Sequence, residues 1–265
     1  MRGTIRLITS AADRQISKSD WIKQWINSQK NVIMAQKVLG VNYMDNIMDI
    51  DLYKEFSFIE HNLKNRLIER DKGIAIFQGK IPVLLSAPHS SEQTREGKIK
   101  SSESRTASIV QYIHEKEACF GAFKTMNFND DANYDKESYY KNELIKLIQD
   151  NKLKLLYDLH IMAPEREHCV DIGTGLGRNI LFRNDLLEIL RNNFNFYSVD
   201  RVKVDYMFDA LYENTVSSTI SKKCGIPCFQ IEINWNLLDE KSPDNKLTPI
   251  IKVICKSMHE ALEIL

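Results

Sequence analysis

The chain has 265 residues, of which 43% are hydrophobic and 27% are charged, and its 36 Lys and Arg residues balance 36 Asp and Glu residues. The net charge of zero argues against nucleic acid or an anionic membrane as a partner, because either would favour a basic excess. No apolar run approaches the ~18 residues that a bilayer span requires. Asp13 and Arg14 interrupt the short apolar stretch near the N-terminus, so we expect a cytoplasmic protein.

Residues 1–72 show helical spacing of apolar residues and none of the clusters that suggest chemistry. Ser19 can cap a helix that begins near Trp21, and a second helix is expected over residues 52–70. We therefore expect a helical N-terminal extension, packed on a main domain over residues 73–265.

From residue 73 onward, expected strands alternate with expected helices. Residues 73–86 read as two strands joined near Gly79. Further strands are expected over 153–158 and 228–233, and helices over 106–119, 137–150, 185–192, 215–223 and 247–265. The alternation predicts one α/β domain, a three-layer α/β/α sandwich whose mixed, mainly parallel sheet lies between helical layers.

Three of these expected strands carry polar residues at or near their carboxyl ends. One leads into His89, one into Asp158 and His160, and the third contains Glu232. In open α/β sheets, ligands bind beyond the carboxyl ends of the strands. Buried charges are costly unless they are paired or bind a metal. The pattern therefore predicts a metal site with His89 and His160 as two of its ligands.

The third metal ligand has two candidates. Glu103 is expected to open the helix that follows His89, where it would add an oxygen ligand to the two imidazoles. Two histidines, one carboxylate and a water form the open tetrahedral site of a catalytic zinc ion. A carboxylate at a helix start is also favoured by the helix dipole without any metal. Glu92 is the alternative, because it completes an H-x-x-E pattern with His89.

Five short motifs resemble the N-formylglutamate amidohydrolase-like family between residues 75 and 240. They are Ala87-Pro-His89, Arg95-x-Gly97-Lys98-x-Lys100, Glu103-x-x-Thr106, Asp158-Leu-His160 and Gln230-Ile-Glu232-Ile-Asn234. Their order and spacing carry the likeness. The resemblance implies the phosphorylase/hydrolase-like sandwich of zinc carboxypeptidases and zinc muramoyl-alanine amidases. It also implies a zinc ion held by His89, Glu103 and His160, and it favours Glu103 over Glu92.

By the same resemblance, Glu232 is the catalytic carboxylate that moves a proton between activated water and the leaving nitrogen. A glutamate among apolar strand residues is also where a raised pKa is expected. Asp158 is expected to orient His160 through a hydrogen bond. Candidate substrate contacts are Arg95, Lys98, Lys100 and Asn133.

These residues together predict a zinc-dependent amidohydrolase that cleaves the linear amide of a small, N-formylglutamate-like N-acyl amino acid. A peptidoglycan-type amidase or a zinc carboxypeptidase is the alternative reaction, and a non-catalytic binding module of the same fold is the alternative without chemistry. The family has a glycine-rich continuation after its first Pro-His, where this chain has Ser90-Ser91-Glu92. We therefore expect the fold to transfer more closely than the substrate.

Overall fold

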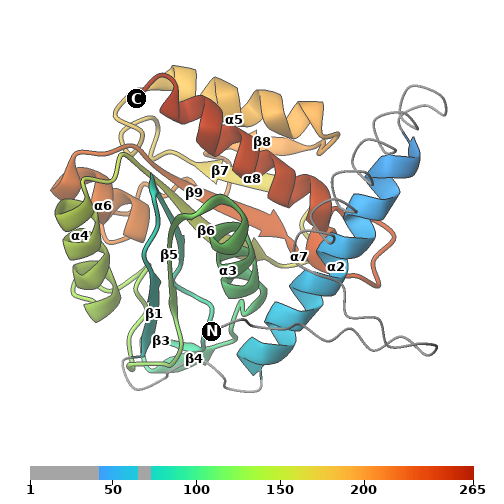
Figure 1. Ribbon diagram of the computed structural model, residues 1–265. Helices are drawn as coiled ribbons and strands as arrows, with labels where there is room; N and C mark the ends of the chain where they lie inside the picture. Colours follow the sequence, from blue (N-terminus) through green and yellow to red (C-terminus); the bar gives the residue numbers. More distant parts are fainter. Residues whose placement is uncertain (1–41, 65–72) are drawn as a thin grey trace, which may run out of the picture. The chain divides into compact units, whose positions relative to one another are not determined.

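The computed structural model describes residues 42–64 and 73–265 (Figure 1). The helix expected near Trp21 and the domain boundary expected at residue 72 lie outside these residues. The chain divides into two units, Met1–Tyr53 and Lys54–Leu265, with the boundary inside helix α2 (Asn42–Lys64). The second unit contains the sheet and the candidate site.

A seven-stranded sheet with the order β1-β5-β2-β6-β9-β7-β8 forms the centre of the second unit. The strands are β1 (Ile74–Phe77), β2 (Ile81–Ala87), β5 (Cys119–Lys124), β6 (Leu155–Met162), β7 (Val170–Gly173), β8 (Val202–Val204) and β9 (Cys228–Asn234). Neighbouring strands pair in parallel except β1 with β5 and β7 with β9. The predicted mixed, mainly parallel sheet is confirmed. A small separate hairpin joins β3 (Gln93–Arg95) to β4 (Lys98–Lys100).

Helices cover both faces of this sheet, which confirms the predicted α/β/α sandwich. They are α3 (Arg105–Glu117), α4 (Tyr139–Asn151), α5 (Asn184–Phe196), α6 (Val216–Cys224), the short α7 (Trp235–Leu238) and α8 (Leu247–Leu262). One layer contains α3, α5 and α8, and the other contains α4 and α6 (Figure 1). None of the helices in the described part of the chain is both long and apolar enough to cross a membrane.

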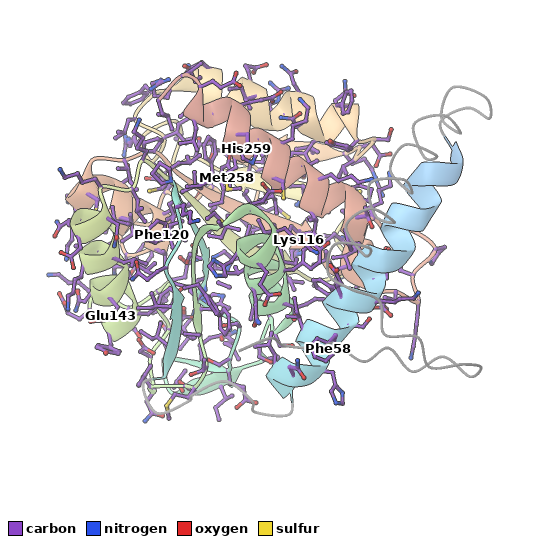
Figure 2. The ribbon with its side chains drawn as sticks, viewed as in Figure 1. Phe58, Lys116, Phe120, Glu143, Met258 and His259 are labelled. Atoms are coloured by element: carbon purple, nitrogen blue, oxygen red, sulfur yellow. The ribbon has the colours of Figure 1, made fainter. Side chains whose placement is uncertain are left out.

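The central strands are buried on both faces, which explains why their sequences are continuously apolar rather than alternating. Val83, Leu84 and Leu85 of β2 are fully buried. The long helix α8 buries a stripe with helical spacing that includes Ile250, Ile254 and Met258. The next residue, His259, is half exposed and pairs with Glu117 of α3 at 2.7 Å. Both Met258 and His259 are labelled in Figure 2.

Two expected elements end differently in the structure. The helix expected to run to residue 119 ends earlier, because Ala118 adopts the left-handed conformation, and Cys119 then begins β5. The strand expected over residues 153–158 begins later and continues to Met162, which places His160 inside β6 rather than after it. The helix expected over residues 185–192 is longer in the structure, since α5 runs from Asn184 to Phe196.

Candidate active site

The carboxyl ends of β2, β6 and β9 lie side by side and deliver the polar residues to one edge of the sheet. Register pairs Ser86 of β2 with Asp158 of β6, and His160 of β6 with Glu232 of β9. The turn after β2 then brings the ring of His89 against the ring of His160, with centroids 4.7 Å apart in an edge-on arrangement. The expected convergence of these strands is therefore present.

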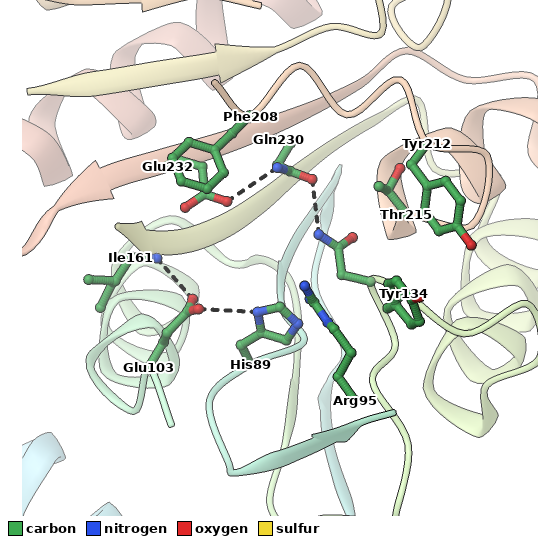
Figure 3. Close-up of a pocket in the computed structure, with 11 residues that line it drawn as sticks. His89, Arg95, Glu103, Tyr134, Ile161, Phe208, Tyr212, Thr215, Gln230 and Glu232 are labelled. Carbon is green, nitrogen blue, oxygen red and sulfur yellow. Dashed lines mark hydrogen bonds and ion pairs between the residues drawn. The ribbon is translucent and has the colours of Figure 1, made fainter. Parts of the chain in front are cut away.

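His89, Glu103 and His160 form one compact group of metal-ligating atoms. The Nδ1 atom of His89 lies 3.1 Å from Oε1 of Glu103 and 3.2 Å from Nδ1 of His160. The Nδ1 atom of His160 is 3.6 Å from Oε2 of Glu103. Glu103 is fixed because Oε2 accepts a hydrogen bond from the backbone of Ile161 at 2.9 Å (Figure 3).

Glu103 does not open a helix as expected, because α3 begins two residues later, at Arg105. The first turn of that helix contains no acidic residue. The carboxylate oxygens of Glu103 bond the backbone of Ile161 and the ring of His89, and no hydrogen bond to the first N–H groups of this helix accounts for them. Glu92, the alternative ligand, is exposed, and the metal-ligating group of the described residues does not include it. The geometry favours Glu103.

A buried aspartate bonds the Nε2 atom of each imidazole, on the side of the ring away from the Nδ1 atoms. Nε2 of His89 lies 2.9 Å from Oδ1 of Asp131, and Nε2 of His160 lies 3.0 Å from Oδ2 of Asp158. Both aspartates are fully buried. With each Nε2–H donated to a carboxylate, each Nδ1 can present its lone pair to a cation. The two Nδ1 atoms lie 3.2 Å from each other and next to the carboxylate of Glu103, and a divalent ion fits this donor set.

The charged residues of this group shift one another's pKa values. Burial alone raises the pKa of Glu103, but the neighbouring His89 and His160 outweigh it and hold that pKa at about 2. Burial disfavours protonated His89, yet Glu103 and Asp131 raise its pKa above the ordinary value. The pKa of His160 is raised well above its ordinary value, because Asp158 and Glu103 outweigh burial. The group is therefore built to hold positive charge.

We expect zinc affinity to increase with pH through and above pH 6.5. Both imidazoles must lose a proton to bind metal, and the pKa values of His89 and His160 lie above the ordinary 6.5. Protons therefore compete with zinc most strongly below these raised pKa values. Calorimetric titration of metal-stripped protein between about pH 6 and pH 8 measures this effect. Affinity that stays flat over this range would contradict binding through the two histidines.

Glu232 lines the same cavity as His89 and Glu103, and it is almost fully buried. Burial raises its pKa to about 7, with the charge of Glu103 adding to the effect of burial and His160 opposing it. A carboxyl group with this pKa can accept and return a proton near neutral pH.

A chain of amides points at Glu232. The backbone N–H of Val216 donates to Oδ1 of Asn133 at 2.8 Å, so the Nδ2 group of Asn133 faces Gln230 and donates to its Oε1 at 3.1 Å. Nε2 of Gln230 then donates to Oε1 of Glu232 at 3.2 Å. Because a backbone N–H can only donate, it fixes the direction of the whole chain. Asn133, expected as a substrate contact, lines the same cavity, and its side-chain amide is also part of this chain of hydrogen bonds.

Replacing Asn133 with alanine should lower kcat by about 2–10-fold and change KM less, because the freed Gln230 no longer holds Glu232 in one orientation. The loss of an ordered donor should also move the acid limb of the pH–rate profile to higher pH. The matched control is Asn151→Ala, since Asn151 bonds only the backbone of Leu147 at the end of α4. Equal effects of the two substitutions would contradict a role for the chain.

Of the three basic residues expected to contact substrate, one lines the cavity and two do not. Arg95 lines the cavity, and its Nε and Nη2 atoms bond Oδ2 of Asp131 at 2.8 and 2.7 Å. Lys98 and Lys100 are exposed on β4 and do not line this cavity. The expected basic contact with substrate therefore depends on Arg95 alone.

The cavity has a volume of about 450 Å³. Several residues that line it, or that bond its lining residues as Asp131 does, were not identified from the sequence. Gln230 could have been found, because residues two apart on a strand share a face and Gln230 precedes Glu232 by two. Asp131 lies in an acidic turn where nothing distinguishes it from Asp130. Tyr134 comes from the loop between β5 and α4, whereas Phe208 and Tyr212 come from the loop between β8 and α6, and no sequence pattern links the two loops.

No protein-family model and no curated protein matches the chain. Solved structures do. The chain is similar to an N-formylglutamate amidohydrolase from Ralstonia eutropha, with 10% identity, a TM-score of 0.49 and coverage of 72% of this chain and 98% of that one. It is also similar to a bacteriophage poly-gamma-glutamate hydrolase, with 10% identity, a TM-score of 0.47 and coverage of 72% and 88%.

Proposed function

We propose that this protein is a metal-dependent amidohydrolase that cleaves the linear amide of a small N-acyl amino acid. The observation that carries the proposal is the group of His89, Glu103 and His160, two of which line one cavity together with the buried carboxyl group of Glu232. Three metal-ligating side chains beside a carboxyl group with a pKa of about 7 match the needs of hydrolysis by activated water.

The roles follow from the contacts. His89, Glu103 and His160 would hold the ion, zinc by the chemistry of the donor set, and Asp131 and Asp158 orient the two imidazoles. When bound, the ion supplies a Lewis acid that activates water for attack on the amide carbon. Glu232 accepts the proton from that water and returns it to the departing nitrogen. The Nη1 group of Arg95, which has no partner among the described residues, can donate to one substrate oxygen.

A hydrolysis screen tests this proposal. Zinc-loaded protein is incubated with N-formyl amino acids, N-acetyl amino acids and short peptides, and release of the free amine is measured. We expect cleavage of at least one N-acyl amino acid. Cleavage confined to peptides would favour the amidase or carboxypeptidase reaction instead. If metal-loaded protein binds substrates and cleaves none of them, the chain is a binding module of this fold.

A further inference from the structure

The cavity has a polar part and an aromatic part. The polar part is lined by His89, Glu103, Asn133, Gln230 and Glu232, and the aromatic part by Tyr134, Phe208 and Tyr212. In Figure 3, Phe208 lies beside Glu232, whereas Tyr134 and Tyr212 lie together beyond Gln230. The two tyrosine rings are 5.7 Å apart with an angle of 30° between their planes. A substrate held at the polar part is therefore within reach of aromatic rings.

The loop that carries Phe208 is held by hydrogen bonds to a buried aspartate. The fully buried carboxylate of Asp171 accepts the backbone N–H groups of Tyr206, Met207 and Phe208 at 3.2, 2.7 and 3.1 Å. A carboxylate that gathers three consecutive N–H groups holds the loop in one conformation. Phe208 is thus presented to the cavity by a rigid loop.

The two tyrosines are tied to each other through their loops. Nδ2 of Asn214 donates to the carbonyl of Tyr134 at 3.2 Å and to the hydroxyl of Tyr212 at 3.0 Å. Nζ of the buried Lys141 donates to the carbonyls of Asp135 and Asn214, both at 2.6 Å. Arg95 lies over the ring of Tyr134 at 5.0 Å. Binding against such a preorganised wall costs little ordering.

The charges of the cavity disfavour a second substrate carboxylate. Arg95 is the one Lys or Arg side chain among the described residues that line it, and Asp131 already neutralises that guanidinium. The proposed ion would be the other cation of the site, but it would be held by Glu103 next to Glu232, where the reacting amide and not a side-chain carboxylate has to lie. One carboxylate can bond the remaining Nη1 group of Arg95, but a second would be left without a cationic partner, which is costly in a desolvated pocket.

We propose that the substrate of this site is an N-acyl amino acid with an aromatic side chain, which packs against Tyr212, Tyr134 and Phe208, and not the dianionic N-acyl derivative of an acidic amino acid. This inference rests on the proposed hydrolase function and narrows its substrate class. Tyr212, half exposed at the cavity, is the specificity-determining residue that tests it best.

The experiment compares N-formyl-L-phenylalanine, N-formyl-L-glutamate and N-formyl-L-alanine as substrates of the zinc-loaded protein. We expect kcat/KM for the phenylalanine substrate to exceed that for the glutamate substrate by about tenfold or more. Tyr212→Ala should lower kcat/KM for the phenylalanine substrate by about 2–10-fold, mainly through KM. The same variant should lower kcat/KM for the alanine substrate by a clearly smaller factor, and Tyr212→Phe should keep the aromatic preference.

Tyr139→Ala is the matched control, because Tyr139 is 49% exposed against 50% for Tyr212 and does not line the cavity. Equal or faster cleavage of the glutamate substrate overturns the aromatic inference and leaves the hydrolase proposal intact. An equal loss on all three substrates in Tyr212→Ala also overturns it.

If the wild type cleaves none of the three, binding to zinc-loaded Glu232→Gln protein decides the inference separately. Tighter calorimetric binding of the phenylalanine compound sustains the aromatic site, even where the full screen of N-formyl, N-acetyl and peptide substrates shows no hydrolysis and the hydrolase proposal fails. Equal or weaker binding overturns both.

Discussion

Replacing Glu232 with glutamine is expected to lower kcat by about 10²–10⁴, because the variant loses the group that accepts and returns the proton. Glutamine keeps the size of the side chain, and Gln230 can still contact the amide oxygen that replaces Oε1. KM should change much less than kcat, since Glu232 is assigned to proton transfer and not to binding. Steady-state hydrolysis of an N-acyl amino acid by both proteins measures the effect.

The pH dependence gives a second readout of the same substitution. Glu232, whose pKa is raised to about 7 by burial, is protonated below that pH and cannot act as a base there. Activity of the wild type should therefore rise with pH up to about 7, and a nearby bound cation would move this limb to lower pH. The limb should disappear in Glu232→Gln. The control is Glu188→Gln on the exposed face of α5, and full activity of Glu232→Gln would disprove the assigned role.

Replacing Glu103 with glutamine is expected to weaken zinc binding by more than about 100-fold. Loss of a residue that only hydrogen-bonds a metal ligand typically costs about 10–100-fold, and Glu103 is assigned as a ligand. The carboxylate is ionised at all ordinary pH values, since its pKa is held at about 2. Its replacement therefore removes a full negative charge beside two imidazoles. Calorimetric zinc titration of the metal-stripped variant measures the loss.

Glu92→Gln is the matched control for this measurement. Glu92 is the other carboxylate that the sequence offered as a ligand, and in the structure it is exposed and outside the group. Its substitution should leave zinc affinity unchanged within about twofold. If Glu92→Gln abolishes zinc binding and Glu103→Gln does not, the ligand set is wrong and the H-x-x-E pattern of the sequence is the true one.

The sequence predicted the fold class well, because strands buried on both faces produce continuous apolar runs that are easily recognised. It also placed His89, His160 and Glu232 at one edge, since parallel strands deliver the residues near their carboxyl ends to a common edge. Element ends were less predictable. The stop at Ala118 depends on a left-handed backbone conformation, and the extension of β6 to Met162 depends on pairing with β9.

The rest of the site depends on contacts between distant segments. Asp131 reaches His89 from a loop 42 residues away, and Asn133 reaches Gln230 across 97 residues. Such side-chain contacts leave no periodic pattern in the sequence. Closeness in sequence also misled the prediction for the basic loop. Arg95, Lys98 and Lys100 were expected to contact substrate together. In the hairpin of β3 and β4, only Arg95 lines the cavity.

Amide hydrolysis before and after metal removal tests the central proposal most directly. The protein is stripped with a chelator, its metal content is verified, and activity toward an N-acyl amino acid is measured as zinc is added back. We expect activity to be lost on stripping and restored in full by about one equivalent of zinc, as for a single three-ligand site. Hydrolysis that persists in protein verified to be metal-free would contradict a metal-dependent amidohydrolase.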